Sequence, residues 1–369
     1  MKIGILTVPF NNNFGGFLQA YALKRVLNSL GHDVIFINRR RNKSRGWRGA
    51  IKDILLKIGI LKNLEKKLSI NTEKFIQRYL TPGTPYYFSS KELRKCLSYD
   101  FDMCVVGSDQ VWRYRYAQDS IDDFFFSFLK NTTIPRISYA ASFGTDSLEE
   151  YPEDKKNECT KLLTSFSGLS VREKSGIKLL QELGIRKDRI SVVLDPTLLL
   201  TKEDYYDSLI KDYNIDRPAR KYIFNYILDN STDKEQLTDR IAKSLGYEVI
   251  RLKAQTETTE QVQPIACVEE WLHRIYHSDF VITDSFHGTV FSILFNKPFI
   301  VIGNKSRGLT RFKDLLTMIG LEHRMIESTY DFKIDMINGL INWYYINSLI
   351  KRQREISLNF LTQNLATVQ

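Results

Sequence analysis

Short apolar strands alternate with amphipathic helices along most of the chain, and this alternation constrains the fold more than any other feature. The opening segment is the clearest: residues 2–8 predict a strand, 17–30 a helix with apolar residues at helical spacing, and 32–38 the next strand. Gly31 is placed to end that helix. Successive strands that are joined by crossover helices run parallel, so the pattern predicts α/β structure with helices on both faces of parallel sheets.

Two series of strands follow one another, with a polar segment at 201–220 between them. A chain of 369 residues also exceeds what one hydrophobic core usually serves. We therefore expect two Rossmann-like, doubly wound domains, at residues 1–200 and 201–334, that face across a cleft in an arrangement resembling the GT-B architecture. A C-terminal helical segment, 335–369, completes the chain. The remaining strands are predicted at 102–107, 136–141, 168–172, 190–194, 221–228, 247–252, 280–283 and 298–302, and the remaining helices near 233–245, 267–278, 286–296, 308–319 and 335–366.

Several classes of protein are disfavoured by the composition. No run reaches the roughly 18 uncharged apolar residues that a membrane span requires, and the first residues read as a strand rather than a signal peptide, so we expect a cytoplasmic protein. Four cysteines lie far apart without ligand-like spacing, which favours reduced structural thiols over disulfides or zinc. We expect no metal and no cofactor.

The net charge of +10 is concentrated near the N-terminus, because residues 1–100 contain 19 Lys and Arg against 6 Asp and Glu. Within this region, residues 50–68 place Ile and Leu on one helical stripe and lysines on the remainder. A basic amphipathic helix of this kind can lie on anionic lipid headgroups. The alternative is a surface helix that packs its stripe on the core. We expect no nucleic-acid partner, since no recognition motif accompanies the charge.

The strongest candidate site lies at 280–291, where a buried apolar strand ends in polar residues and an apolar helix follows. Asp284 or Ser285 could cap this helix, which would place His287 in its first turn. The backbone N–H groups of a helix start, together with the helix dipole, favour a phosphate or carboxylate. The alternative is a capped helix with a histidine that only packs.

Three further cations follow the next predicted strand, at Lys305, Arg307 and Arg311. Arginine binds phosphate and carboxylate in a bidentate manner, so this segment predicts an anion clamp, or else a solvated loop.

The first domain also carries polar groups directly after its strands. Arg172 ends one strand, where it could bind an anionic ligand or pair with Glu173. Ser108, Asp109 and Gln110 follow another strand, where they could bind sugar hydroxyls or cap a helix.

Taken in order, six short segments resemble the polysaccharide pyruvyltransferase family over roughly residues 2–320. They are Asn13-Phe14-Gly15-Gly16 with Leu18-Gln19-Ala20, Gly107–Gln110, Ser138–Gly144, Ser170–Ser175, Leu194–Thr197 and Asp284–Gly288. The resemblance implies a GT-B-like fold, phosphoenolpyruvate as donor, and a lipid-linked sugar of a surface polysaccharide as acceptor. The product would be a pyruvate ketal, with the first domain on the acceptor side and the second on the donor side.

The resemblance also implies roles for individual residues. His287 matches the catalytic histidine, and its imidazolium would be the general acid. Asp195 matches the acid of the Leu-Asp-Pro turn, so Asp109 or Asp195 would orient or deprotonate an acceptor hydroxyl. Ser285 stands where many members carry Arg, which shifts the anchoring of the donor to other residues. The expected donor-binding residues are Arg172, Ser175, Ser285, Gly288, Lys305, Arg307 and Arg311, and the expected acceptor-binding residues are Asn13, Gly15, Gly16, Gln19, Ser108 and Gln110.

Two other functions remain open at this point. The same fold would suit a glycosyltransferase that uses a nucleotide sugar. The substitution at Ser285 would suit a non-catalytic scaffold of polysaccharide assembly.

Overall fold

The computed structural model describes residues 1–11, 13–40, 60–213, 215, 218–252, 265–304 and 307–367, with residues 60–68 described by their backbone alone. The chain forms two compact units. Unit 1 comprises residues 1–66, 76–199 and 352–369, and unit 2 comprises residues 67–75 and 200–351. The predicted basic amphipathic helix lies largely outside the described residues. From residue 60 the chain is helical, in α3 (Ile60–Tyr79).

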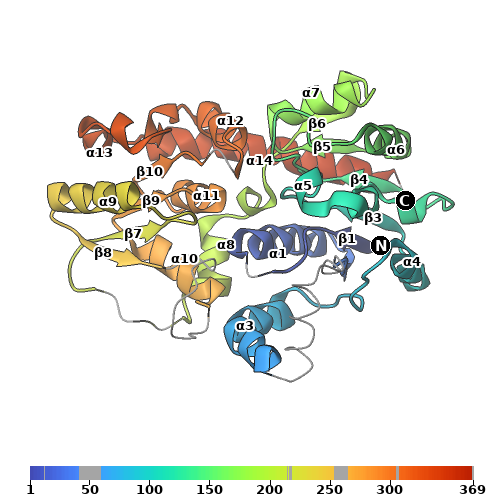
Figure 1. Ribbon diagram of the computed structural model, residues 1–369, viewed down its shortest axis with the longest axis horizontal. Coiled ribbons are helices and arrows are strands. Elements are labelled where there is room, and N and C mark those ends of the chain that lie inside the picture. Colours follow the sequence, from blue (N-terminus) through green and yellow to red (C-terminus); the bar gives the residue numbers. More distant parts are fainter. Residues whose placement is uncertain are drawn as a thin grey trace. The chain divides into compact units, whose positions relative to one another are not determined.

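Unit 1 is built on a parallel sheet in the strand order β2-β1-β3-β4, and isolated parallel bridges beside β4 join it to the pair β5-β6. The strands are β1 (Lys2–Leu6), β2 (Asp33–Ile37), β3 (Met103–Val106), β4 (Arg136–Ser138), β5 (Leu169–Val171) and β6 (Ile190–Val192). Its helices are α1 (Phe14–Ser29), α4 (Ser90–Leu93), α5 (Tyr114–Ala117), α6 (Glu153–Leu163) and α7 (Lys174–Glu182) (Figure 1). The order reverses between β1 and β3, which makes this the switch point where open α/β sheets bind ligands.

Unit 2 repeats this architecture with a parallel sheet in the order β11-β10-β9-β7-β8. The strands are β7 (Tyr222–Tyr226), β8 (Glu248–Arg251), β9 (Phe280–Thr283), β10 (Phe299–Ile302) and β11 (Met325–Ile326). The helices are α8 (Lys202–Tyr205), α9 (Thr232–Leu245), α10 (Val268–His277), α11 (Phe286–Leu294), α12 (Thr310–Ile319) and α13 (Asp335–Asn338) (Figure 1). Here the strand order reverses between β7 and β9.

Two residues of β7 that point to opposite faces, Ile223 and Tyr226, show how the unit 2 sheet is buried on both sides. Ile223 belongs to a core that includes Ile241 of α9. Tyr226 packs instead on Trp271 of α10, with ring centroids 5.4 Å apart. Since successive side chains of a strand point to opposite faces, α9 and α10 cover opposite sides of the sheet. The prediction of α/β structure with doubly wound parallel sheets is confirmed.

The C-terminal segment differs from the single helix predicted at 335–366. The chain leaves the helical conformation at Gly339, between α13 and α14 (Trp343–Ala366). The guanidinium of Arg324 donates hydrogen bonds to the carbonyl oxygens of Met336 and Gly339, each at 2.5 Å. These bonds satisfy carbonyl groups that a continuing helix would have used, which stabilises the break.

Helix α14 begins in unit 2 and ends in unit 1, where it contributes to the core. Arg354 donates from Nε to the carbonyl oxygen of Leu198 at 2.8 Å, and Ser357 Oγ accepts from the backbone N–H of Leu194 at 2.9 Å. Asn364 lies so close to Gly168 that a Cβ on that glycine would stand 2.0 Å from the Asn364 side chain. Residues of the C-terminal helix therefore stabilise the sheet of unit 1.

Candidate functional site

The candidate residues of unit 2 lie at the carboxyl ends of three neighbouring strands. Asp229 follows β7, His287 follows β9, and Asn304 follows β10. Strands β7 and β9 are paired and flank the point where the strand order reverses. The predicted site at 280–291 therefore occupies the switch point of its sheet, which is where ligands bind in folds of this class.

Ser285 is the N-cap of α11, one of the two alternatives that the sequence left open. Its backbone is extended, and its Oγ accepts a hydrogen bond from the backbone N–H of Gly288 at 3.3 Å. A side chain at Gly288 would collide with Thr283, because a Cβ there would lie 2.5 Å from Thr283 Oγ1. That hydroxyl in turn accepts from the backbone N–H of Ser285 at 3.0 Å and donates to the carbonyl of Tyr226 at 2.7 Å. The turn is thus fixed from both sides.

His287 is the second residue of α11, as the sequence predicts. The side chain is buried, with 6% of its surface exposed, and its ring packs on that of Phe286 with centroids 5.3 Å apart. The first turn of a helix has backbone N–H groups without intrahelical partners and a partial positive charge. His287 is therefore placed beside groups that attract an anion.

Asp284 is fully buried and accepts four hydrogen bonds instead of capping α11. Oδ1 accepts from the backbone N–H of Leu228 at 2.6 Å, and Oδ2 from that of Asp229 at 3.2 Å. Oδ2 also accepts from Lys234 Nζ at 2.8 Å and, more weakly, from Asn304 Nδ2 at 3.4 Å. One carboxylate therefore ties together the segments that follow β7, β9 and β10.

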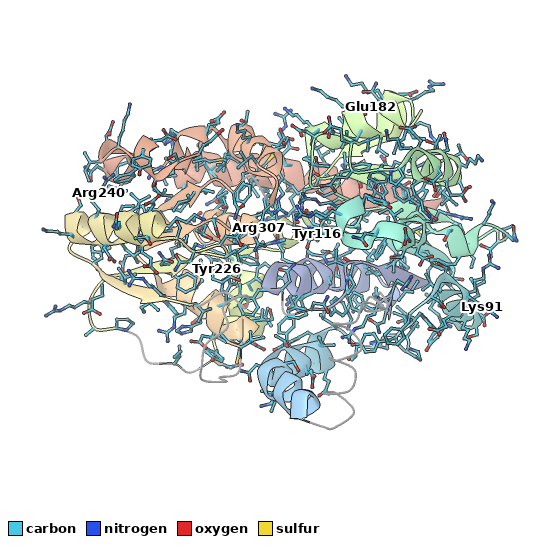
Figure 2. All side chains as sticks on the ribbon, viewed as in Figure 1. Lys91, Tyr116, Glu182, Tyr226, Arg240 and Arg307 are labelled. Atoms are coloured by element: carbon cyan, nitrogen blue, oxygen red, sulfur yellow. The ribbon has the colours of Figure 1, made fainter. Side chains whose placement is uncertain are left out.

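Arg307 is held by Asp229, although the sequence predicts it as part of an anion clamp. Its Nε and Nη2 donate to the two carboxylate oxygens of Asp229 at 2.8 and 2.9 Å, and Asn304 Nδ2 donates to the same group at 2.5 Å. Figure 2 labels Arg307 and Tyr226, both in unit 2. The bidentate pair fixes the orientation of the guanidinium. An anionic ligand would have to compete with Asp229 for these donors.

The structure describes one of the other two cations of the predicted clamp, Arg311, but not the second, Lys305. The guanidinium of Arg311 is buried and lies over the ring of Phe286, 5.1 Å from its centroid, and so is placed beside the residue that precedes His287. Lys305 lies outside the described residues.

The Asp229–Arg307 pair predicts a specific dependence of stability on pH. The hydrogen bond from Arg307, supported by that from Asn304, lowers the pKa of Asp229 from 3.8 to about 2. A depressed carboxyl pKa stabilises the fold above the unfolded pKa, and this contribution is lost as the pH falls from about 4 to about 2. Because Asp229 is 44% exposed, solvent screens the pair and the contribution is on the order of 1 kcal/mol or less. The free energy of unfolding of Asp229→Asn should fall less between pH 4 and pH 2 than that of the wild type, and equal slopes would contradict the assignment.

In unit 1, Arg172 stands among three carboxylates. Its Nη1 donates to Asp195 Oδ2 at 2.5 Å, Nε lies 3.6 Å from Glu173 Oε2, and Nη2 lies 3.8 Å from Asp109 Oδ1. Burial alone lowers the pKa of Arg172, but the carboxylates of Asp195, Glu173 and Asp109 outweigh burial and raise it. The cluster joins the ends of strands β3, β5 and β6, and its negative groups outnumber its cation. Such a set of acceptors suits the hydroxyl groups of a sugar.

Asp195 is the most constrained of these acids. Oδ1 accepts from the backbone N–H and the hydroxyl of Thr197 at 3.0 and 2.7 Å, while Oδ2 accepts from Ser108 Oγ at 3.2 Å as well as from Arg172. Asp109 has a left-handed backbone with φ +72° and accepts from Asn13 Nδ2 at 3.4 Å. The structure thus brings together five of the predicted residues: Asn13, Ser108, Asp109, Arg172 and Asp195.

The remaining predicted residues of unit 1 take other positions. Gln19 is buried and donates to Thr7 Oγ1 and to the carbonyl of Gly16, so it supports the loop after β1. Gln110 accepts from Arg113 Nη1 at 2.9 Å. Gly15 lies in the buried first turn of α1. Ser175 is buried in the first turn of α7, and its Oγ has no hydrogen-bond partner within the described part of the chain.

Sequence reasoning missed Asp229, Lys234 and the role of Asn304. A signal for the first was present, because Asp229 begins a polar turn directly after a buried strand. Lys234 lies within α9 and carries no such signal, since only the pairing of β7 with β9 brings it to Asp284.

Among the described residues, no helix is both long and apolar enough to span a bilayer. The same residues include no group of three or more His, Cys, Asp or Glu side chains that could hold a metal ion.

Comparison with known families gives one match, to the model described as polysaccharide pyruvyl transferase, over residues 13–306. This range includes the switch point of unit 2 and all the candidate residues except Arg307 and Arg311. No curated protein matches the sequence.

Solved structures with a similar fold include UDP-GlcNAc 2-epimerases. That of Neisseria meningitidis, bound to UDP-GlcNAc, has a TM-score of 0.58 and 11% identity and covers 98% of this chain and 100% of its own. A putative UDP-N-acetylglucosamine 2-epimerase of Listeria monocytogenes has a TM-score of 0.54 and 9% identity, with 96% and 90% covered. That of Methanocaldococcus jannaschii has a TM-score of 0.51 and 12% identity, with 95% and 92% covered. At these identities the likeness establishes a GT-B fold. The reaction has to be inferred from the residues of the site.

Proposed function

Because the chain belongs to the polysaccharide pyruvyl transferase family, we propose that it transfers the enolpyruvyl group of phosphoenolpyruvate to a sugar of a surface-polysaccharide precursor, forming a pyruvate ketal. The observation that carries the proposal is the position of His287, buried in the first turn of α11 at the switch point of unit 2. A proton donor beside an anion-attracting helix start is what protonation of a phosphorylated enol requires.

The chemistry of ketal formation fixes what the residues must do. A proton adds to the methylene carbon of phosphoenolpyruvate, and positive charge develops at the neighbouring carbon, C2. One sugar hydroxyl forms a C–O bond to C2, the C2–O bond to phosphate breaks, and a second hydroxyl forms the other C–O bond. Of the two protons that the hydroxyl groups lose, one restores the general acid and the other leaves with phosphate.

In this scheme unit 2 serves the donor. His287 gives the proton to the methylene carbon. The backbone N–H groups at the start of α11, which is capped by Ser285, attract the phosphate or carboxylate. Arg311 supplies positive charge from its place over Phe286. The bidentate pair with Asp229 engages Nε and Nη2 of Arg307, so we assign Arg307 a positioning role.

Unit 1 serves the acceptor, a lipid-linked sugar. The carboxylate of Asp195 is engaged by Thr197, Ser108 and Arg172, so we assign it to positioning. Asp109, at the turn after β3, is our candidate to orient or deprotonate an acceptor hydroxyl. The excess of carboxylates around Arg172 supports binding of hydroxyl groups at this edge, and a donor-binding role for Arg172 and Ser175 stays a prediction.

The direct test is incubation of the purified protein with phosphoenolpyruvate and a saccharide acceptor. We expect release of inorganic phosphate and a product whose mass increases by one pyruvate unit. Titration calorimetry with phosphoenolpyruvate should show binding. Addition of a glycosyl residue from a nucleotide sugar, or no binding of phosphoenolpyruvate with or without acceptor, would contradict the proposal.

We also propose that the protein works in the cytoplasm, peripherally at the inner face of the membrane, where a lipid-linked acceptor is found. The support is the basic charge of residues 41–68, most of which lie outside the described residues. About 1 kcal/mol of attraction per nearby Lys or Arg would give measurable binding to an anionic surface. The protein should co-sediment with anionic liposomes at low salt and less so at high salt, and indifference to lipid charge would remove this idea.

A further inference from the structure

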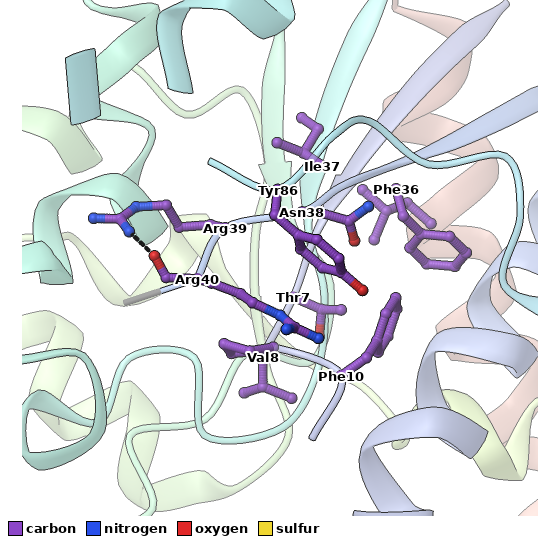
Figure 3. A pocket seen from close by; sticks show the side chains of 11 residues that line it. Thr7, Val8, Phe10, Phe36, Ile37, Asn38, Arg39, Arg40 and Tyr86 are labelled. Carbon is purple, nitrogen blue, oxygen red and sulfur yellow. Dashed lines mark hydrogen bonds between the residues drawn. The ribbon is translucent and has the colours of Figure 1, made fainter. Parts of the chain in front are cut away.

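A partly open hollow lies in unit 1 at the carboxyl ends of β1 and β2 (Figure 3). Its lining includes Thr7 and Phe10, which follow β1, Asn38 and Arg40, which follow β2, and Tyr86 from a later loop. This loop is held in place because Arg40 donates its backbone N–H to the carbonyl of Tyr87 at 2.9 Å. None of the functions assigned above uses the hollow.

The two adjacent arginines of the lining differ in how their charge is compensated. The guanidinium of Arg39 is buried and donates from Nε to Asp123 Oδ2 at 2.7 Å, and it also donates to the carbonyl oxygen of Arg40. Within the described part of the chain, Arg40 has neither a carboxylate partner nor an acceptor for its buried Nε. Among the described residues that line the hollow, Arg40 is therefore the cation without a carboxylate partner.

The guanidinium of Arg40 lies over the ring of Tyr86, with Cζ 3.8 Å from the ring centroid. Figure 3 shows this group reaching between Tyr86, Phe10 and Thr7. Stacking on an aromatic face uses the faces of the guanidinium and leaves its N–H groups, which lie in its plane, for a ligand. An oxyanion is the partner that such a fork of donors prefers.

The hollow is directly connected to the turn that carries the candidate acceptor residues. Thr7, in its floor, donates from Oγ1 to the backbone carbonyl of Ser108 at 3.1 Å, and Asp109 is the next residue. The space, its open mouth included, amounts to about 240 Å³. Much of this space is open to solvent, so the hollow is shallow and a ligand group such as a phosphate would bind at its mouth.

We propose that this hollow binds the phosphate of a glycosyl phosphate or glycosyl diphosphate acceptor, with Arg40 as the anion ligand and Tyr86 and Phe10 as apolar walls for the adjoining sugar. The inference rests on the proposed function, because it places the anionic end of the acceptor beside the Ser108–Asp109 turn. It makes the phosphorylated form of the precursor, rather than a finished neutral polysaccharide, the substrate.

The test is titration calorimetry with glucose 1-phosphate as probe and glucose as its neutral counterpart, without phosphoenolpyruvate. Wild-type protein should bind glucose 1-phosphate measurably more tightly than glucose. Arg40→Gln should weaken binding of the phosphate ester about tenfold to hundredfold, the range expected for loss of a hydrogen bond to a charged group. Arg94→Gln removes the same charge from an exposed position of unit 1 outside the hollow and should leave binding unchanged. Thermal unfolding of each variant verifies that it is folded.

Equal affinity of the wild type and Arg40→Gln for glucose 1-phosphate, or equal affinity of the wild type for glucose and its phosphate, would overturn the inference. A comparable loss in Arg94→Gln would also overturn it, because it would reflect charge in general. Ketal formation separates this inference from the proposed function. If the protein forms the ketal but its binding of glucose 1-phosphate does not depend on Arg40, only the phosphate site is wrong. If binding depends on Arg40 but no ketal is formed, the proposed function is wrong and the hollow remains an anion site.

Discussion

His287→Ala should lower the rate of ketal formation by about 10²- to 10⁴-fold, the usual contribution of a positioned general acid. The reason is that protonation of the methylene carbon is the step that generates positive charge at C2, and without it neither sugar hydroxyl can add. The fold should survive, because the cap that starts α11, in which Ser285 Oγ accepts from the N–H of Gly288, is retained. Phosphate release measured with saturating phosphoenolpyruvate and acceptor reports the change.

Two further variants make this result specific. His287→Gln retains the volume of the side chain and should be as inactive as the alanine variant, since an amide cannot replace the imidazolium as an acid. His323→Ala removes an exposed histidine of the same unit and should retain wild-type turnover. Near-normal turnover of His287→Ala would show that another group supplies the proton.

Asp284→Ala should lower the free energy of unfolding by about 3–5 kcal/mol, as is typical when one partner of a buried ion pair is removed. The change leaves Lys234 Nζ without its carboxylate and the backbone N–H groups of Leu228 and Asp229 without their acceptor. All these groups lie at the end of the unit 2 sheet, so they lose partners at the same time. Denaturant unfolding followed by circular dichroism measures the loss.

The matched control for Asp284→Ala is Asp239→Ala. Asp239 also pairs with a cation, Arg251, but it is 66% exposed. Exposed ion pairs contribute about 0.2–1 kcal/mol, so this variant should be only slightly destabilised. Equal losses in the two variants would contradict the view that Asp284 holds three strand ends together.

The fold was largely predictable because its signals are local. Residues 280–294 show this best: an uninterrupted apolar strand, a polar turn, and Ser285 followed by an apolar helix specify a strand, a cap and a helix without reference to the rest of the chain. The same holds for β1, α1 and β2, where Gly31 takes the left-handed conformation, with φ +85°, just after the helix ends.

The parts that were not predicted depend on contacts between distant residues. Arg324 stabilises the break in the C-terminal helix through carbonyl groups 12 and 15 positions away, although Asn338-Gly339 is a local signal for a helix end. The compensation of Arg307 by Asp229 spans 78 positions, so the loop at 303–311 reads as an open clamp in the sequence. Likewise, Asp109 and Asp195 follow different strands and meet Arg172 only through the order of the sheet.

The return of α14 to unit 1 has a consequence for how the protein is made. Residues 1–199 are synthesised first. At that stage the chain lacks Arg354, Ser357 and Asn364, which contact the segment after β6 and the residue before β5. Unit 2 has all its residues once Lys351 has emerged, whereas unit 1 must wait for the last 18 residues, 352–369. Unit 1 is therefore begun first and completed last. A chain truncated before residue 352 would contain all of unit 2 but only part of unit 1.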